Sequence, residues 1–298
     1  MPFMIPISTM PSSLVTTKHF AAKMEENIKR VESRDSDYIK DSNETNIHDI
    51  RTAVRRLDAS YKSLPKKLRR NNRISRYMNT SKQLFKLNSQ IRDYDIIGEK
   101  LQKYSSDTMY NKLSNLLKKR RETKLASARK VALSLRDVRR PQIDESDLPP
   151  NKLEARFNKV VARLVESIEL DLPIVLTNPD KIKELHELRK DCKKLRYLLE
   201  LIPHHDSNSN DKGVNSKDIN AMITTLEDIQ DILGSIHDND TAISFLKQVS
   251  RRKKWKVSHI LHNEISERAK KYEDLIQFCK RNLSDNTHNF LKQIALMG

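Results

Sequence analysis

Residues 185–197 read LHELRKDCKKLRY, and residues 47–57 read IHDIRTAVRRL. Each copy has a histidine, an arginine three positions later, and a basic pair at positions seven and eight. Because a helix turns about 100° per residue, the histidine, the arginine and the first of the basic pair fall within roughly 60° of one another. These same-face residues are His48, Arg51 and Arg55 in one copy, and His186, Arg189 and Lys193 in the other. The two copies therefore predict two helices with matching cationic stripes, one in each half of a duplicated fold.

Glycine is scarce, with only four in 298 residues. Sheet proteins use glycine in many of their turns, so this scarcity favours long helices. It also excludes the glycine-rich loops that hold phosphate in nucleotide-binding proteins, and no cofactor is expected. The sequence thus predicts an all-α protein.

The formal charge of +17 indicates a polyanionic partner or an anionic surface. No run of 18 apolar residues occurs, so no membrane insertion is expected. The N-terminus lacks a basic segment followed by an apolar block, and two cysteines make no disulfide framework. Cys192 lies on the apolar side of its helix and is predicted to be buried. A cytoplasmic location is expected.

The chain divides at a segment with three prolines and three acids, residues 141–150, which is typical of a linker. Residues 1–13 are expected to be irregular. Residues 14–298 are then a single domain, in which 14–140 form a first helical bundle and 151–298 a second. The prediction is two pseudo-symmetric antiparallel four-helix bundles that arose by internal duplication.

Apolar spacing predicts separate helices within each half. In the first half they cover about 45–64, 74–87 and 110–139, with another starting after the phrase RDYD at 92–95. In the second half they include about 153–170, the His186 helix, 218–233, 240–249 and 256–283. The phrase Ile91-Arg92-Asp93 aligns with Ile236-His237-Asp238, which extends the repeat beyond the histidine helices.

At these phrases the chain resembles the CHAD family, a helical domain named for its histidines. The run around His186 is similar to the family's L-H-x-L-R-K-x-x-K-R-L-R-Y-x-x-E, with Lys194 in place of arginine. The run around His48 and the phrase RDYD also match family motifs, as does Ile229-Gln230-Asp231-Ile232-Leu233-Gly234. The family usually continues with Asn-Asp where this chain has His237-Asp238, which leaves the role of His237 open. The resemblance implies two pseudo-symmetric bundles and binding of inorganic polyphosphate in a basic central groove.

The stripes suit such a ligand, because arginine grips two phosphate oxygens with a planar fork and lysine supplies a mobile charge. The residues expected to line the groove are His48, Arg51, Arg55, His186, Arg189, Lys190, Lys193 and Arg196. Lys82, Lys86 and Arg92 are weaker candidates that extend the first stripe. The expected function is non-catalytic, and association with polyphosphate granules is one expected setting. Histidines among cations predict affinity that rises as the pH falls through roughly 6.5.

Two alternatives stay open. The basic segments 118–130 and 251–254 could serve RNA or another polyanion, although aromatic residues make up only 5% of the chain. Metal-dependent phosphohydrolases carry His-Asp doublets, and three short phrases of this chain superficially resemble them. These phrases are His48-Asp49, His237-Asp238 and His204-His205-Asp206. Metal sites need several such side chains to converge, whereas the same-face neighbours of His48 and His186 are cations. No metal is therefore expected.

Overall fold

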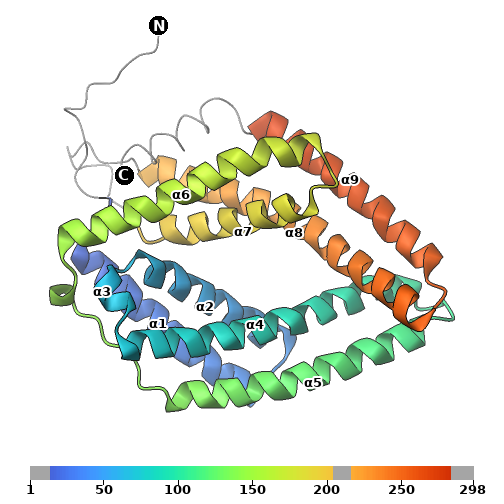
Figure 1. The fold of residues 1–298 in the computed structure, drawn as a ribbon, viewed down its shortest axis with the longest axis horizontal. Helices are drawn as coiled ribbons and strands as arrows, with labels where there is room; N and C mark the ends of the chain where they lie inside the picture. The colour runs from blue at the N-terminus through green and yellow to red at the C-terminus, as the bar shows by residue number, and fades with distance from the viewer. Residues whose placement is uncertain (1–13, 204–215, 283–298) are drawn as a thin grey trace, which may run out of the picture.

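The computed structural model describes residues 14–203 and 216–282 (Figure 1). Within these ranges the chain forms helices and connecting loops without a strand, so the predicted all-helical class is confirmed. The segment 1–13, expected to be irregular, lies outside the described residues, as does most of the polar loop that follows Pro203.

The first half contains four long helices and one short one. They are α1 (Thr17–Lys40), α2 (Glu44–Ser63), α3 (Lys66–Arg69), α4 (Asn72–Leu101) and α5 (Tyr110–Asp137). Asparagine caps start two of them: the Asn43 side chain accepts a hydrogen bond from the backbone N–H of Asn46, and Asn71 does the same at the start of α4. Helix α2 packs against both α1 and α4, while α5 packs against α4 and α1.

The described residues of the second half form α6 (Pro150–Thr177), α7 (Ile182–Leu199), α8 (Ser216–Lys253) and α9 (Ser258–Asn282). Helix α7 packs against α6 and α8, and α9 packs against α8. The halves meet where α2 contacts α6 and α7 and where α4 contacts α8 (Figure 1). The histidine-containing helices α2 and α7 therefore face each other at the junction.

Helices α4 and α8 are each continuous where the sequence predicted two shorter helices, and that prediction is wrong. In α4 the apolar pattern lapses because polar residues occupy buried positions. Each has a partner: Tyr38 Oη donates to Asn88 Oδ1 at 3.0 Å, and Arg121 Nε donates to Asp95 Oδ1 at 2.6 Å. Buried polar groups that keep a hydrogen bond do not interrupt a helix. Arg92 consequently lies in the middle of α4 rather than at a helix start.

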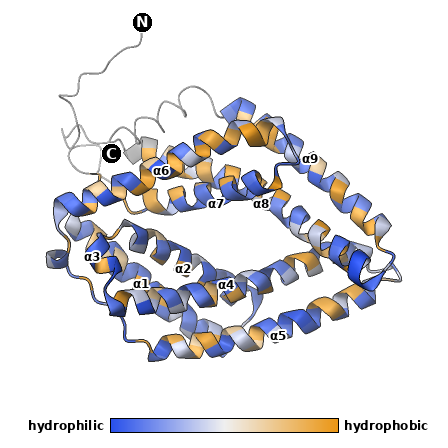
Figure 2. Ribbon diagram, viewed as in Figure 1, coloured by the Kyte–Doolittle hydropathy of each residue, from blue (hydrophilic) through white to orange (hydrophobic). Residues whose placement is uncertain are grey.

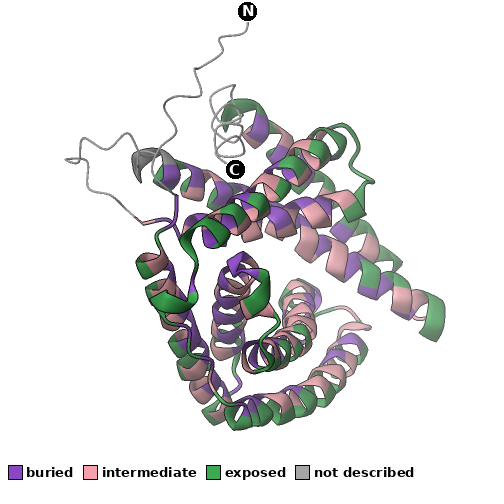
Figure 3. Ribbon diagram, turned by 60° about the vertical axis from the view of Figure 1, so that its left-hand side comes forward, coloured by how far each residue is buried: buried purple, intermediate pink, exposed green. Residues whose placement is uncertain are grey.

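Apolar residues on the facing sides of the helices form the core (Figures 2 and 3). The main cluster runs across the junction of the halves, from Phe20 and Leu57 to Phe157 and Leu195. It includes Cys192, whose predicted burial is confirmed. A second cluster joins the ends of α4 and α8 to the starts of α5 and α9. Among the described residues, no helix is long and apolar enough to cross a membrane.

Candidate functional site

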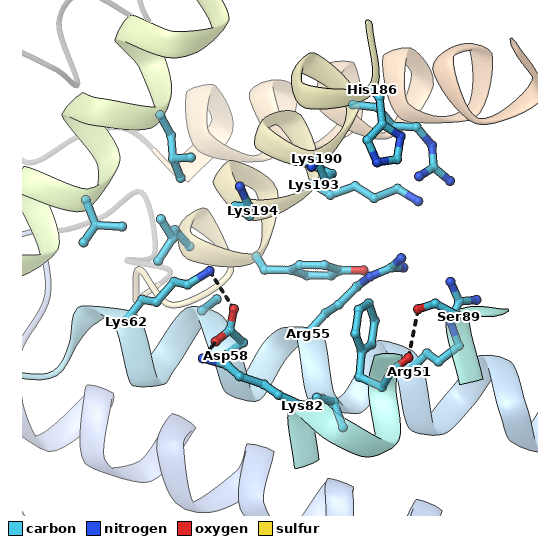
Figure 4. Close-up of a pocket in the computed structure, with 18 of the residues that line it drawn as sticks. Arg51, Arg55, Asp58, Lys62, Lys82, Ser89, His186, Lys190, Lys193 and Lys194 are labelled. Carbon is cyan, nitrogen blue, oxygen red and sulfur yellow. Dashed lines mark hydrogen bonds and ion pairs between the residues drawn. The ribbon is translucent and has the colours of Figure 1, made fainter. Parts of the chain in front are cut away.

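A cavity of about 580 Å³ lies at the junction of the halves and is lined by α2, α4, α6, α7 and α8. Figure 4 shows Arg51 and Arg55 on α2 opposite His186 and Lys193 on α7. The cationic lining consists of Arg51, Arg55, Lys62, Lys82, Arg156, Arg163, Arg189, Lys190, Lys193 and Lys194. Apolar side chains, among them Val54, Val160 and Leu198, form the rest of the wall. Carbon-lined walls lower the local dielectric and strengthen any charge interaction inside.

Four lysines of the lining form ion pairs with three acids of the protein. Asp58 forms ion pairs with Lys62 at 2.7 Å and with Lys82 at 2.8 Å (Figure 4). Burial alone would raise the pKa of Asp58, but the two ammonium groups hold it below its usual value. Lys190 and Lys194 pair in the same way with acids one turn back on α7, Glu187 and Asp191.

The other six cations of the lining have no such acid: Arg51, Arg55, Arg156, Arg163, Arg189 and Lys193. In the described part of the chain no carboxylate lies within ion-pair distance of any of them. Burial, followed by the charge of neighbouring arginines, lowers the pKa of Lys193 to about 6 and that of Arg51 to about 9. Burial likewise lowers the pKa of Arg189, with Arg55 adding to the effect. The site therefore concentrates positive charge at an energetic cost that a bound anion would offset.

Two of these arginines also carry unsatisfied donors. The Nε atoms of Arg51 and Arg189 are buried and have no hydrogen-bond partner within the described residues. The two residues occupy the same position of the two sequence copies. A buried N–H without an acceptor costs free energy, and native structures retain few of them without a reason. Both donors fit a ligand that brings acceptor oxygens into the cavity.

His186 and His237 meet at one side of the cavity. Their Nδ1 atoms are 3.3 Å apart and their ring centroids 4.8 Å apart. Burial and the charge of Arg189 lower the pKa of His237 to about 3, and burial lowers that of His186, with Lys190 and Arg189 adding to the effect. Both imidazoles are thus neutral near pH 7, where one ring donates and the other accepts.

Two aspartates complete the electrostatics of this region. Asp93 lines the cavity, and burial raises its pKa while Arg51 opposes the rise. Burial also raises the pKa of Asp238, which is opposed most strongly by Arg189. These carboxyl groups partly balance the arginines without forming a direct ion pair with them.

The structure brings seven of the eleven predicted site residues to the cavity lining: Arg51, Arg55, Lys82, His186, Arg189, Lys190 and Lys193. The other four lie outside the lining. His48 is 64% exposed and contacts Asp49, and Lys86 is exposed. Arg92 pairs with Glu44 and Glu99, and Arg196 pairs with Glu200 and Glu227.

Sequence reasoning missed the contribution of α6, which supplies Arg156 and Arg163. These residues are seven apart, which is two helical turns, so a search for basic stripes on every helix would have found them. It also missed Lys62, seven positions after Arg55 on α2. His237, whose role the sequence left open, lies in the lining through its contact with His186.

The described residues form no cluster of potential metal ligands. Within 14–203 and 216–282, no three His, Cys, Asp or Glu side chains gather as a metal site requires. The triplet 204–206 lies outside the described residues. The basic segments of α5 and of the end of α8 do not contribute to the cavity lining.

The fold and the site define an all-helical protein that gathers basic side chains from two halves around one internal cavity. The family model described as "CHAD domain" matches residues 22–247, and the chain belongs to this family. The comparison with curated proteins found no match.

Several solved structures share the fold, among them the following two. The crystal structure of the CHAD domain from the plant Ricinus communis matches with a TM-score of 0.58 at 15% sequence identity, covering 100% of this chain and 96% of that chain. PptA from Streptomyces chartreusis matches with a TM-score of 0.55 at 11% identity, covering 95% of this chain and 100% of that chain. At these identities the likeness concerns the fold.

Proposed function

We propose that this protein binds inorganic polyphosphate in the cavity between its halves and does not catalyse its turnover. The observation that carries the proposal is the convergence of Arg51, Arg55, Arg189 and Lys193 on one cavity without a direct ion pair to any carboxylate of the described residues. The resemblance of the two histidine phrases to CHAD motifs supports the same ligand. A chain of phosphates supplies both the negative charge and the acceptor oxygens that these side chains lack.

The division of the cations suggests how the ligand is held. The arginines grip phosphate oxygens with their planar forks, and Lys193 adds a point charge once it is protonated. Asp58 offsets one of the two charges of Lys62 and Lys82, so these lysines attract the ligand less than the unpaired arginines do. Polyphosphate has no bases, so the carbon-lined wall is needed only to keep water out.

The proposal extends to the origin and setting of the protein. We interpret α1, α2, α4 and α5 and then α6 to α9 as two pseudo-symmetric four-helix bundles derived from one ancestral unit. The equivalent positions of Arg51 and Arg189 support this duplication. A cytoplasmic location with association to polyphosphate granules would fit the proposed ligand.

Competition among ligands tests the proposal. Long polyphosphate, triphosphate, single-stranded RNA and double-stranded DNA are compared at matched phosphate concentration and physiological salt, with the variant Arg51→Glu plus Arg189→Glu alongside wild type. Long polyphosphate should bind most tightly, and the variant should lose this binding. The matched control is Lys270→Glu plus Lys271→Glu, which makes the same charge change at exposed positions of α9 and should bind normally.

Two outcomes would replace the proposal. If RNA or duplex DNA outcompetes polyphosphate for the cavity, the protein is a nucleic-acid-binding module. If a divalent metal produces steady release of phosphate that the double variant abolishes, the protein is a phosphohydrolase.

In cells, tagged wild-type protein should gather at phosphate granules, and the double variant should not.

A further inference from the structure

Two basic segments that do not reach the cavity lie together at the opposite end of the molecule. Residues 251–263 carry five lysines and arginines and no acid, and residues 110–121 carry the same number and no acid. The first segment ends α8 and begins α9, and the second begins α5. Figure 1 shows the turn between α8 and α9 beside the start of α5.

Direct contacts hold these segments side by side. Arg120 Nη1 donates to Gln248 Oε1 at 3.0 Å, and its guanidinium lies 5.5 Å from the ring centre of Phe245. The second apolar cluster packs Leu113 of α5 with Val249 and Val257 from the α8–α9 region. The relative position of the segments is therefore fixed by packing and does not depend on a flexible loop.

The exposed cations of this region define a surface that we call the distal basic surface. Its members are Lys112, Lys118, Lys119, Arg251, Arg252, Lys253, Lys254 and Lys256. In the described part of the chain no carboxylate forms an ion pair with any of them. Among the neighbouring acids, Asp107 contacts His259 and Glu264 pairs with Lys100 and Lys103, whereas the exposed Glu122, which follows the second segment on α5, forms no ion pair within the described residues.

An aromatic ring lies within this surface. Trp255 is the single tryptophan of the chain; it is partly buried against the second apolar cluster, and Lys253 Nζ lies 5.5 Å from its ring centre. The backbone around it is a fixed turn, because Lys254 has a left-handed φ of 57° and the N–H of Val257 donates to the carbonyl of Trp255 at 3.1 Å. In the sequence of this turn, Trp255 stands between Lys254 and Lys256.

We propose that the distal basic surface binds single-stranded nucleic acid, independently of the cavity. Unpaired cations on α5 and α8 follow the phosphate backbone, and Trp255 stacks with an unpaired base. A partly exposed indole on an open basic surface can stack with a base, a contact that an acidic protein or a bare phosphate polymer does not use. No residue of this surface lines the cavity, so the two sites can be separated by mutation.

Tryptophan fluorescence tests this proposal directly, because all of the tryptophan emission comes from Trp255. Full-length protein is titrated with oligouridine RNA, oligothymidine DNA and polyphosphate at fixed salt. Both oligonucleotides should quench the emission in a saturable way, and polyphosphate should not, because it has no base to stack. The variant Arg251→Glu plus Arg252→Glu should weaken the oligonucleotide affinity by about tenfold or more, because two phosphate contacts become repulsive.

Controls separate this site from the cavity. The oligonucleotides should quench the tryptophan emission of the Arg51→Glu plus Arg189→Glu variant as they quench that of wild type. The same result is expected for Lys270→Glu plus Lys271→Glu. The affinity of the Trp255→Phe variant for labelled RNA is measured by fluorescence anisotropy. It should be only modestly weaker than that of wild type, because phenylalanine keeps an aromatic ring. The proposal is overturned if the Arg251/Arg252 variant binds both oligonucleotides as tightly as wild type. It is equally overturned if the cavity variant abolishes their binding, or if polyphosphate alone occupies the surface.

Discussion

His186 on α7 and His237 on α8 approach each other until their Nδ1 atoms are 3.3 Å apart. At that distance the two nitrogens can share one proton, and two imidazolium rings would repel each other. After burial, the charge of Arg189 does most to lower the pKa of His237. The charges of Lys190 and Arg189 lower the pKa of His186 in the same way. The pair therefore links the protonation state of the cavity to the stability of the fold.

Acid should destabilise the protein through His237. Its pKa is lowered from 6.5 to about 3 in the folded state, so the unfolded chain binds the proton more readily. The stability contributed by neutral His237 is complete above pH 6.5 and is lost as the pH falls toward 3, by up to about 1.4 kcal/mol per pH unit. Denaturant unfolding between pH 7 and 4 should show a shallower decline for His237→Gln. The exposed His48→Gln variant should keep the wild-type slope, and equal slopes for all three proteins would contradict the prediction.

Binding of polyphosphate should consume a proton at Lys193. With a pKa of about 6, this amine is mostly neutral at pH 8, and bound phosphates favour its charged form. Affinity should therefore fall as the pH rises above 6, by up to about tenfold per unit. Calorimetry in two buffers with different ionisation enthalpies should detect the proton uptake. Lys193→Gln should bind more weakly at pH 5.5, show less uptake and approach wild-type affinity at pH 8.5. Identical affinities of wild type at pH 5.5 and 8 would be incompatible with this linkage.

Salt dependence should distinguish residues of the cavity from residues outside it. The log of the polyphosphate affinity should fall linearly with the log of the salt concentration as counterions are released. If single-stranded nucleic acid is a guide, removing one contacting charge reduces the slope by about 0.7. Arg189→Gln should show this reduction, whereas Lys86→Gln, which alters an exposed residue outside the lining, should not. The reverse pattern would move the binding site out of the cavity.

Glu264 should be a major source of stability at the end of the molecule remote from the cavity. Its carboxylate is 1% exposed and is contacted by Lys103 at 2.8 Å, Lys100 at 3.5 Å and Asn239 Nδ2 at 3.0 Å. These contacts join α4 to α8 and α9. Glu264→Leu leaves the buried amide of Asn239 without its side-chain acceptor and removes the partner of two partly exposed amines, which should cost about 2 kcal/mol in denaturant unfolding. Glu267→Gln, at the exposed carboxylate beside the same lysines, should cost less than about 1 kcal/mol. Similar losses for both variants would disprove the special role of Glu264.

Much of the fold could be predicted from local patterns. Apolar residues at three- and four-residue spacing predict helices from local sequence, without knowledge of contacts elsewhere in the chain. The scarcity of glycine argues against a fold rich in tight turns. The same periodicity placed Arg51 and Arg55 on one face, and it identified Cys192 as buried. It failed in α4, where Asn88 and Asp95 are buried but polar, because their partners come from distant parts of the chain.

The sequence by itself determined which side chains share a helix face, because that depends only on the turn of the helix. Tertiary structure alone decided which of those faces meet: Arg189 enters the cavity, while His48 faces solvent although it lies on the stripe of Arg51. Packing also brought in Arg156 from α6 and lowered the pKa of Lys193. Convergence and burial depend on contacts between residues far apart in the chain, and local periodicity carries no information about them.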